Sequence, residues 1–174
     1  MPRTLAALAA LTLAACNPTS EEACLEAAAV DGTLAVGVGE QTFAAVADGD
    51  TVPLVLGSQG GLMVLGALRV TGIVQGALLF GDADNPLVDF QLLAPDGAVL
   101  GGYTGISRHF VRGADDVLTL VGETLVLGVY SPDTGTVGDT GDGGDPLAGD
   151  VTLSARIGDA CGRELTASRT VRLE

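Results

Sequence analysis

The alternation of apolar and polar residues is clearest near the end of the chain. Apolar residues occupy every second position at Val151, Leu153, Ala155 and Ile157. They return after the turn sequence at 159–162, at Leu165, Ala167, Val171 and Leu173. A two-residue period is that of a half-buried strand, so the two segments predict a closing β-hairpin. Arg169 interrupts the returning apolar face, and we expect its side chain to lie at a sheet rim or to reach outward.

Similar short apolar runs, separated by Gly, Pro and Asp, fill the middle of the chain. Val88, Phe90 and Leu92 alternate with polar residues and stop at a tight-turn sequence, 94–97. Further strands are predicted at 51–56, 62–74, 98–106, 117–121 and 124–130. The first of these places Val52, Leu54 and Leu56 on one face; the segment 62–74 fits one strand, or two with a bend at Gly66 or Gly72. Before them, residues 21–30 can form one or two helical turns.

Many short strands with 26 scattered glycines favour an all-β sandwich or barrel. We predict an antiparallel β-sandwich in which residues 31–174 form a single domain. The closing hairpin resembles the last hairpin of immunoglobulin-like bacterial β-sandwich domains, and the resemblance is one of pattern. The chain departs from the immunoglobulin pattern because it has no Trp and because Cys161 falls in a predicted turn.

The first sixteen residues read as a processing segment. One charge, Arg3, precedes an apolar stretch of 11 residues from 5 to 15, whereas a spanning helix needs roughly 20. The stretch ends in Leu13-Ala14-Ala15-Cys16, which resembles the lipobox of bacterial lipoproteins. The resemblance implies a signal peptide at 1–15, lipidation of Cys16 and a lipid anchor and tether at 16–30. The alternatives are an ordinary secretory signal cut after Ala-x-Ala and a buried apolar helix.

The location that this resemblance implies is the cell envelope, where the protein would be held to a membrane by its lipid. Asn17 follows the cysteine at the position where an Asp would retain a lipoprotein in the inner membrane of enteric bacteria. The outer membrane is therefore the favoured destination.

The cysteine count agrees with an exported protein. If lipid consumes Cys16, the remaining pair is Cys24 and Cys161, and we expect these two to form a disulfide in an oxidising compartment. Two isolated cysteines and one histidine do not make the ligand cluster that zinc requires.

The charge balance excludes nucleic-acid binding. The chain carries 22 acidic residues against 8 basic ones, a formal net charge of −14. Nucleic-acid binding needs cationic groups on phosphates, and stacking on bases needs aromatic residues, which make up 3% of this chain.

The segment 131–150 consists mainly of Asp, Gly, Thr and Pro, which favours a flexible acidic loop. Asp139, Asp142 and Asp145 in it are calcium candidates, because calcium accepts oxygen ligands from acidic loops. Their spacing of three differs from the alternate spacing of calcium loops, so a solvated spacer is the favoured interpretation. The sequence 82–85 comes closer to alternate spacing, but it equally fits a turn before Pro86.

Catalytic motifs are missing. His109 is the only histidine, and adjacent side chains on a strand face opposite ways, so Ser107, Arg108 and His109 cannot converge on one atom. No Gly-x-Ser-x-Gly elbow and no phosphate loop occurs. We therefore expect a non-enzymatic envelope protein without a cofactor that has a structural or a protein-binding role. Its expected partners are the membrane, through the lipid anchor, and another envelope protein. The alternatives are a calcium-dependent adhesion or binding module and a hydrolase whose site is assembled only in three dimensions.

Overall fold

The computed structural model describes residues 21–58, 60–77, 82–131, 136–137 and 149–174. The one helix among them, α1 (Glu21–Ala28), begins with two glutamates, which favour the positive end of a helix dipole. The strands are β1 (Thr33–Val38), β2 (Ala44–Ala45), β3 (Thr51–Val52), β4 (Val55–Leu56), β5 (Gly61–Thr71), β6 (Leu87–Leu93), β7 (Val99–Ser107), β8 (Val111–Arg112), β9 (Leu118–Ser131), β10 (Thr136–Val137), β11 (Asp150–Gly158) and β12 (Glu164–Leu173).

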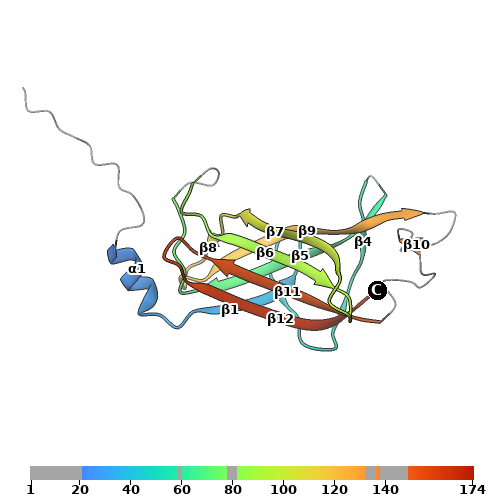
Figure 1. The fold of residues 1–174 in the computed structure, drawn as a ribbon, viewed down its shortest axis with the longest axis horizontal. Helices are drawn as coiled ribbons and strands as arrows, with labels where there is room; N and C mark the ends of the chain where they lie inside the picture. The colour runs from blue at the N-terminus through green and yellow to red at the C-terminus, as the bar shows by residue number, and fades with distance from the viewer. Residues whose placement is uncertain (1–20, 59, 78–81, 132–135, 138–148) are drawn as a thin grey trace, which may run out of the picture.

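Within the described ranges these strands form two sheets that pack face to face, as Figure 1 shows. One sheet has the order β10-β9-β5-β1-β2, with β4 beside β5 and β8 beside β9, and the other has the order β3-β12-β11-β6-β7. The strand pairs are antiparallel apart from β3 with β12. The predicted all-β sandwich is confirmed, and the immunoglobulin-like resemblance stays a prediction from pattern.

The core lies between the two sheets, where every second residue of the central strands points inward. Its largest fully buried side chains are Phe90, Phe110, Leu68, Leu92, Leu118, Leu125, Leu153 and Ile157. Burying a Leu or Phe side chain contributes about 1.5–3 kcal/mol, so this apolar layer is the main source of the fold's stability.

The predicted closing hairpin is formed by β11 and β12. Ile157 pairs with Leu165 and Val151 with Val171, and the four apolar residues predicted on one face of β11 are all buried. Arg169 pairs with Leu153 and is exposed, in agreement with the predicted outward side chain. The alternation predicted around Phe90 is likewise confirmed in β6, whose turn closes with a hydrogen bond from Gly97 N to Ala94 O of 2.9 Å.

The prediction of one strand at 51–56 is wrong. The run 51–56 is not one strand: β3 pairs with β12 in one sheet, and β4 pairs with β5 in the other. Pro53 between them lacks an N–H for a ladder, and Val52 is buried while Leu56 is 59% exposed, so the predicted common face does not exist.

The two runs 117–121 and 124–130 are parts of one strand, β9. The residues between them form an irregularity in the pairing with β5, where the partner of Gly66 is Glu123 and the partner of Leu68 is Leu120. Gly122 adopts a φ of 71° there and donates its N–H to Gly39 O. Gly122 therefore lies in a β-bulge within one strand and not in a turn between two strands. In the segment 62–74, one strand, β5, runs without a break as far as Thr71, and residues 72–74 lie beyond its end.

Most of the predicted acidic loop, 131–150, lies outside the described residues. Within it the structure describes β10, which pairs with Tyr130 and Ser131 of β9. In Figure 1, α1 and the β11–β12 turn lie at one end of the sandwich, and β10 lies at the opposite end.

Candidate functional site

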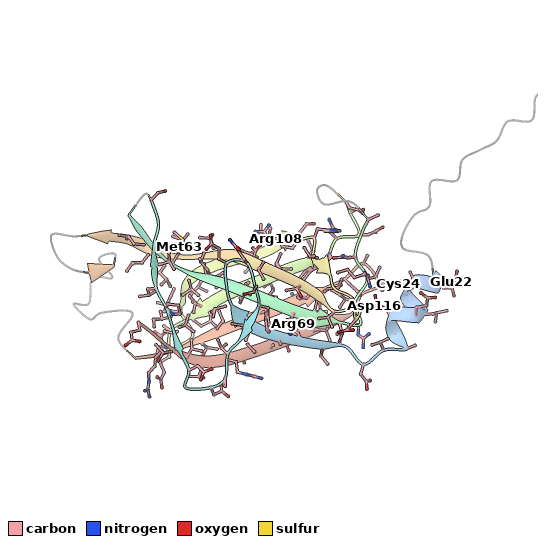
Figure 2. All side chains as sticks on the ribbon, turned by 180° about the vertical axis from the view of Figure 1, so that it is seen from behind. Glu22, Cys24, Met63, Arg69, Arg108 and Asp116 are labelled. Atoms are coloured by element: carbon pink, nitrogen blue, oxygen red, sulfur yellow. A yellow bond between two sulfur atoms is a disulfide. The ribbon has the colours of Figure 1, made fainter. Side chains whose placement is uncertain are left out.

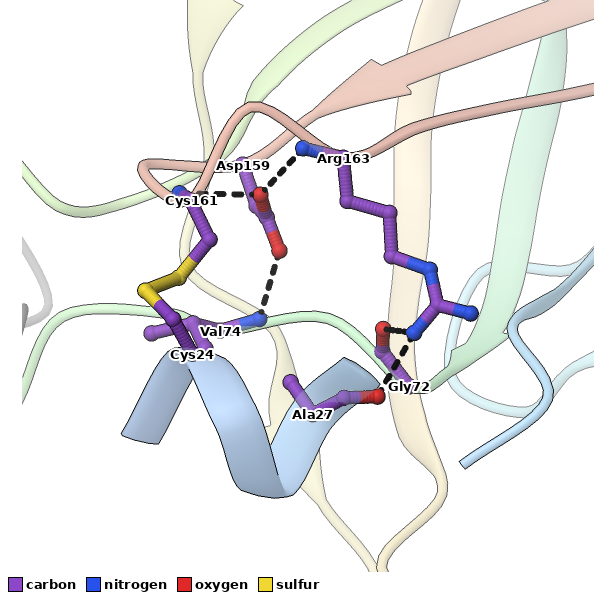
Figure 3. The surroundings of a disulfide bond; sticks show 7 residues. All are labelled: Cys24, Ala27, Gly72, Val74, Asp159, Cys161 and Arg163. Atoms are coloured by element: carbon purple, nitrogen blue, oxygen red, sulfur yellow. Dashed lines mark hydrogen bonds between the residues drawn. A yellow bond between two sulfur atoms is a disulfide. The ribbon is translucent and has the colours of Figure 1, made fainter. Parts of the chain in front are cut away.

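A junction at one end of the sandwich joins α1 to the two sheets. We define the α1 junction as α1 with Val30, the chain leaving β5 at Gly72 and Val74, and the β11–β12 turn from Asp159 to Arg163. Cys24 of α1 and Cys161 of this turn form a disulfide with Cα atoms 5.6 Å apart, inside the usual range of about 4.4–6.8 Å (Figure 3). The predicted disulfide is confirmed, and it links residues separated by 137 positions in the sequence.

Asp159 organises the turn that carries Cys161. Its side chain is 8% exposed and accepts backbone N–H groups on both oxygens: Oδ1 from Cys161 at 3.0 Å and Arg163 at 2.9 Å, and Oδ2 from Val74 at 3.0 Å. Three donors satisfy the carboxylate in a site that is largely closed to water. Since Val74 follows β5, this one side chain connects the hairpin turn of one sheet to the neighbouring sheet.

Arg163 fixes the end of α1. Its Nη1 donates to Ala27 O and to Gly72 O, each at 2.6 Å, and its Nη2 donates to Val30 O at 2.9 Å. The last carbonyls of a helix lack partners within the helix, so a cation here satisfies them and also opposes the negative end of the dipole. Gly72, with a φ of 67°, brings its carbonyl to the guanidinium, and a Cβ at this position would lie 3.0 Å from Nη1.

Helix α1 contributes little apolar burial of its own. None of its residues is buried, and Leu25 is 65% exposed. The disulfide and the Arg163 hydrogen bonds therefore hold α1 against the sandwich, and packing plays a minor part.

A second polar cluster connects β7 of one sheet to β9 of the other sheet. Tyr103 donates its hydroxyl to Glu123 Oε2 at 2.6 Å, and Arg108 Nε donates to the same oxygen at 2.9 Å. Arg108 also lies over the Tyr103 ring, 4.7 Å from its centroid. Burial, the hydrogen bond to Glu123 and the charge of Glu123 raise the pKa of Tyr103 well above its ordinary value, and these effects outweigh Arg108, which lowers it.

Among the residues that the structure describes, His109 does not pair with a carboxylate. Its Nδ1 lies 3.2 Å from Asn85 Oδ1. Asp115 and Asp116 lie in the β8–β9 turn and line a different cavity, beside α1. Asp116 pairs there with Arg112 at 2.8 Å. His109 therefore does not share a cavity with these two aspartates.

The remaining predicted site residues fall in different places. Cys16 and the calcium candidates Asp139, Asp142 and Asp145 lie outside the described residues. The sequence 82–85 forms the turn considered for it, with Asp84 N donating to Asp82 Oδ1 at 3.1 Å. In the part of the chain that the structure describes, no group of three His, Cys, Asp or Glu residues is placed to hold a metal ion.

Nothing in the sequence marked Arg163 as the residue that fixes α1, or Tyr103, Arg108 and Glu123 as one polar cluster. The carbonyls that Arg163 binds lie 91 to 136 positions away along the chain, and Tyr103 and Glu123 are 20 positions apart on strands of different sheets. The turn sequence around Asp159 gave the one local signal, since Asp side chains accept N–H groups from residues that follow them.

In comparisons with known proteins, no family model and no curated protein matches this chain. Across the described ranges, no helix is both long and apolar enough to cross a membrane.

Proposed function

We propose that this protein is a lipid-anchored component of the bacterial cell envelope, whose β-sandwich acts by binding and not by catalysis. Lipid on Cys16 attaches the chain to a membrane, with the outer membrane as the favoured location. The sandwich then contacts another envelope protein through its loops, faces or edges.

The observation that carries the proposal is the α1 junction, together with its place in the chain. Four residues, 17–20, separate Cys16 from α1, and an extended chain of four residues spans at most about 14 Å. Beyond them, the Cys24–Cys161 disulfide and Arg163 fix α1 to one end of the sandwich. A short tether followed by a rigid attachment would keep that end near the bilayer and direct the opposite end, where β10 lies, away from it.

Metabolic labelling with palmitate tests the anchor. We expect the wild-type protein to incorporate label and to fractionate with membranes. The Cys16→Ser variant should incorporate none and remain an uncleaved or mislocalised precursor. A Cys24→Ser/Cys161→Ser variant is the matched control, because it removes two cysteines and should still be labelled. Equal labelling of the wild type and Cys16→Ser would overturn the proposal.

A further inference from the structure

A shallow hollow lies on the outer face of the sheet that contains β5, away from the α1 junction. We call it the Arg69 hollow. Its lining residues come from the β1–β2 connection, from β5, β8 and β9, and from the segment before β8. The polar and aromatic ones are Gln41, Thr42, Phe43, Arg69, His109 and Thr119, and the apolar wall is Val111, Leu120 and Val121.

Strand register places the centre of this hollow in one row across four strands. Arg69 of β5 pairs with Ala35 of β1 on one side and with Thr119 of β9 on the other, and Thr119 pairs in turn with Val111 of β8. Register partners in antiparallel strands present their side chains to the same face, so Arg69, Thr119 and Val111 form a contiguous surface. Val111 is 70% exposed in it.

The guanidinium of Arg69 is held in position by an aromatic ring, with no carboxylate partner among the described acids. Its Cζ lies 4.5 Å from the centroid of the Phe43 ring. Gly37 permits this arrangement, because a Cβ at that position would lie 2.7 Å from Phe43 Cε2. A guanidinium has five N–H donors, and a cation–π contact with one ring does not use all of them, so donors of Arg69 stay available to a ligand.

This freedom sets Arg69 apart from most arginines of the protein. Carboxylates pair with Arg108, Arg112, Arg156 and Arg172, and backbone carbonyls bind Arg163. Arg69 forms no ion pair with any described acid, although the chain carries 22 acidic residues. Figure 2 shows Arg69 on the body of the sandwich, apart from α1, whose position is marked by Glu22 and Cys24.

We propose that the Arg69 hollow binds a carboxylate that carries an apolar group. The carboxylate would lie on the guanidinium edge of Arg69, whose fork matches two carboxylate oxygens, with the Thr119 hydroxyl beside it. The apolar group would cover Phe43 and Val111. Charge complementarity favours this ligand, because the hollow offers a cation and no carboxylate on the surface of an acidic protein. The carboxylate belongs either to a small organic acid or to the end of a polypeptide, and the inference holds whether or not Cys16 is lipidated.

Titration of the full-length 15N-labelled protein, followed by NMR, tests the site with phenylacetate as probe. We expect saturable shifts of the backbone amides of Arg69, Val111 and Thr119. The neutral analogue phenylacetamide should cause none of them. N-acetyl-glycyl-phenylalanine, with a free C-terminus, serves as a second probe: tighter binding than phenylacetate assigns a polypeptide end, and weaker binding assigns a small acid.

Variants locate the binding. Arg69→Gln should weaken phenylacetate binding about tenfold or more, since it removes a charged two-donor contact from an exposed position. Arg69→Lys keeps the positive charge but lacks the two-donor edge of the guanidinium. Its affinity for phenylacetate should lie between those of the wild type and Arg69→Gln. The matched control is Arg169→Gln, which removes an exposed arginine without a described acid partner from the other sheet and should bind as the wild type does. Equal shifts with phenylacetamide, no saturation, or undiminished binding by Arg69→Gln would each overturn the proposal.

Discussion

At the scale of single residues, two charged side chains do most to define the α1 junction. Asp159 accepts three N–H groups, and Arg163 donates to three carbonyls, although the two residues are only four positions apart. They do not pair with each other through their side chains; each satisfies backbone groups that the fold would otherwise leave open. Backbone contacts of this kind depend on geometry more than on the identity of neighbouring side chains, so the surrounding sequence gives little sign of them.

Replacement of Arg163 by Gln should release α1. The variant loses up to three charge-assisted hydrogen bonds, and we expect the free energy of unfolding to fall by about 2 kcal/mol. Hydrogen exchange should accelerate in α1 and around Val30, with little change in β6 and β11. The control is Arg169→Gln, because Arg169 donates only to the neighbouring Ser168 O and is exposed. Equal exchange of α1 in the two variants would show that Arg163 does not hold the helix.

Tyr103 should ionise at a higher pH than an ordinary tyrosine, whose pKa is about 10. Burial is the main cause, and the carboxylate of Glu123 adds to it. The folded state therefore favours the neutral phenol: the stability that Tyr103 contributes is complete below pH 10 and is lost as the pH rises from there towards the folded pKa. Absorbance at 295 nm in a Tyr130→Phe background reports Tyr103 alone, because the chain has two tyrosines. A midpoint near pH 10 in the folded protein would contradict the prediction.

At the scale of elements, the sequence predicted strands best where one face is core and the other is solvent. Alternation in β6 and β11 survives in the structure because each inward residue is buried there. Prediction failed where the chain changes sheets at Pro53 and where a glycine forms the bulge in β9, since both depend on the neighbouring strand. The functional sites also include one that the sequence predicted and one that it did not. The even number of cysteines that remains after Cys16 predicted the disulfide. No feature of the sequence near Arg69 indicated its contact with the ring of Phe43, 26 positions away.

The close packing of β5 against β6 should make Gly66 intolerant of a side chain. A Cβ at Gly66 would overlap the Phe90 ring and would lie 3.3 Å from Leu125 Cδ1. Phe90 is fully buried and meets Tyr103 edge to face at 6.5 Å between ring centroids, so its ring has little room to move. We expect Gly66→Ala to lower the free energy of unfolding by about 1–3 kcal/mol, measured by urea denaturation.

Gly158→Ala is the matched control for Gly66→Ala. Gly158 ends β11, and a Cβ there would meet no heavy atom within 4 Å. Its urea midpoint should stay close to that of the wild type. If both variants shift the midpoint equally, the cost comes from replacing a strand glycine in general and not from overpacking beside Phe90.

At the scale of the whole molecule, the structure separates an attachment end from surfaces that are free to bind. The α1 junction occupies one end of the sandwich, β10 lies at the other, and the Arg69 hollow opens on a sheet face between them. The net charge of −14 keeps most of such a surface hydrated and repels other acidic proteins at low salt. In that field, a cation such as Arg69, which lies in a hollow and pairs with no described carboxylate, would then select the orientation in which an anionic ligand binds.

The acidic segment 131–150, which includes the two-residue strand β10, should be dispensable for the fold. Loop-closure cost grows slowly, by about 0.6 kcal/mol per doubling of length, so replacing residues 134–145 with a short Gly-Ser link should leave the melting temperature nearly unchanged. This should hold in calcium and in chelator alike. A calcium site would behave differently, because a ligand at 100 times its Kd stabilises the folded state by about 2.7 kcal/mol. A full-length variant with Asn at Asp139, Asp142 and Asp145 separates the loss of carboxylates from the loss of length. If calcium raises the melting temperature of the wild type by several degrees but not that of either variant, the segment is a metal site, and the protein is a calcium-dependent binding module.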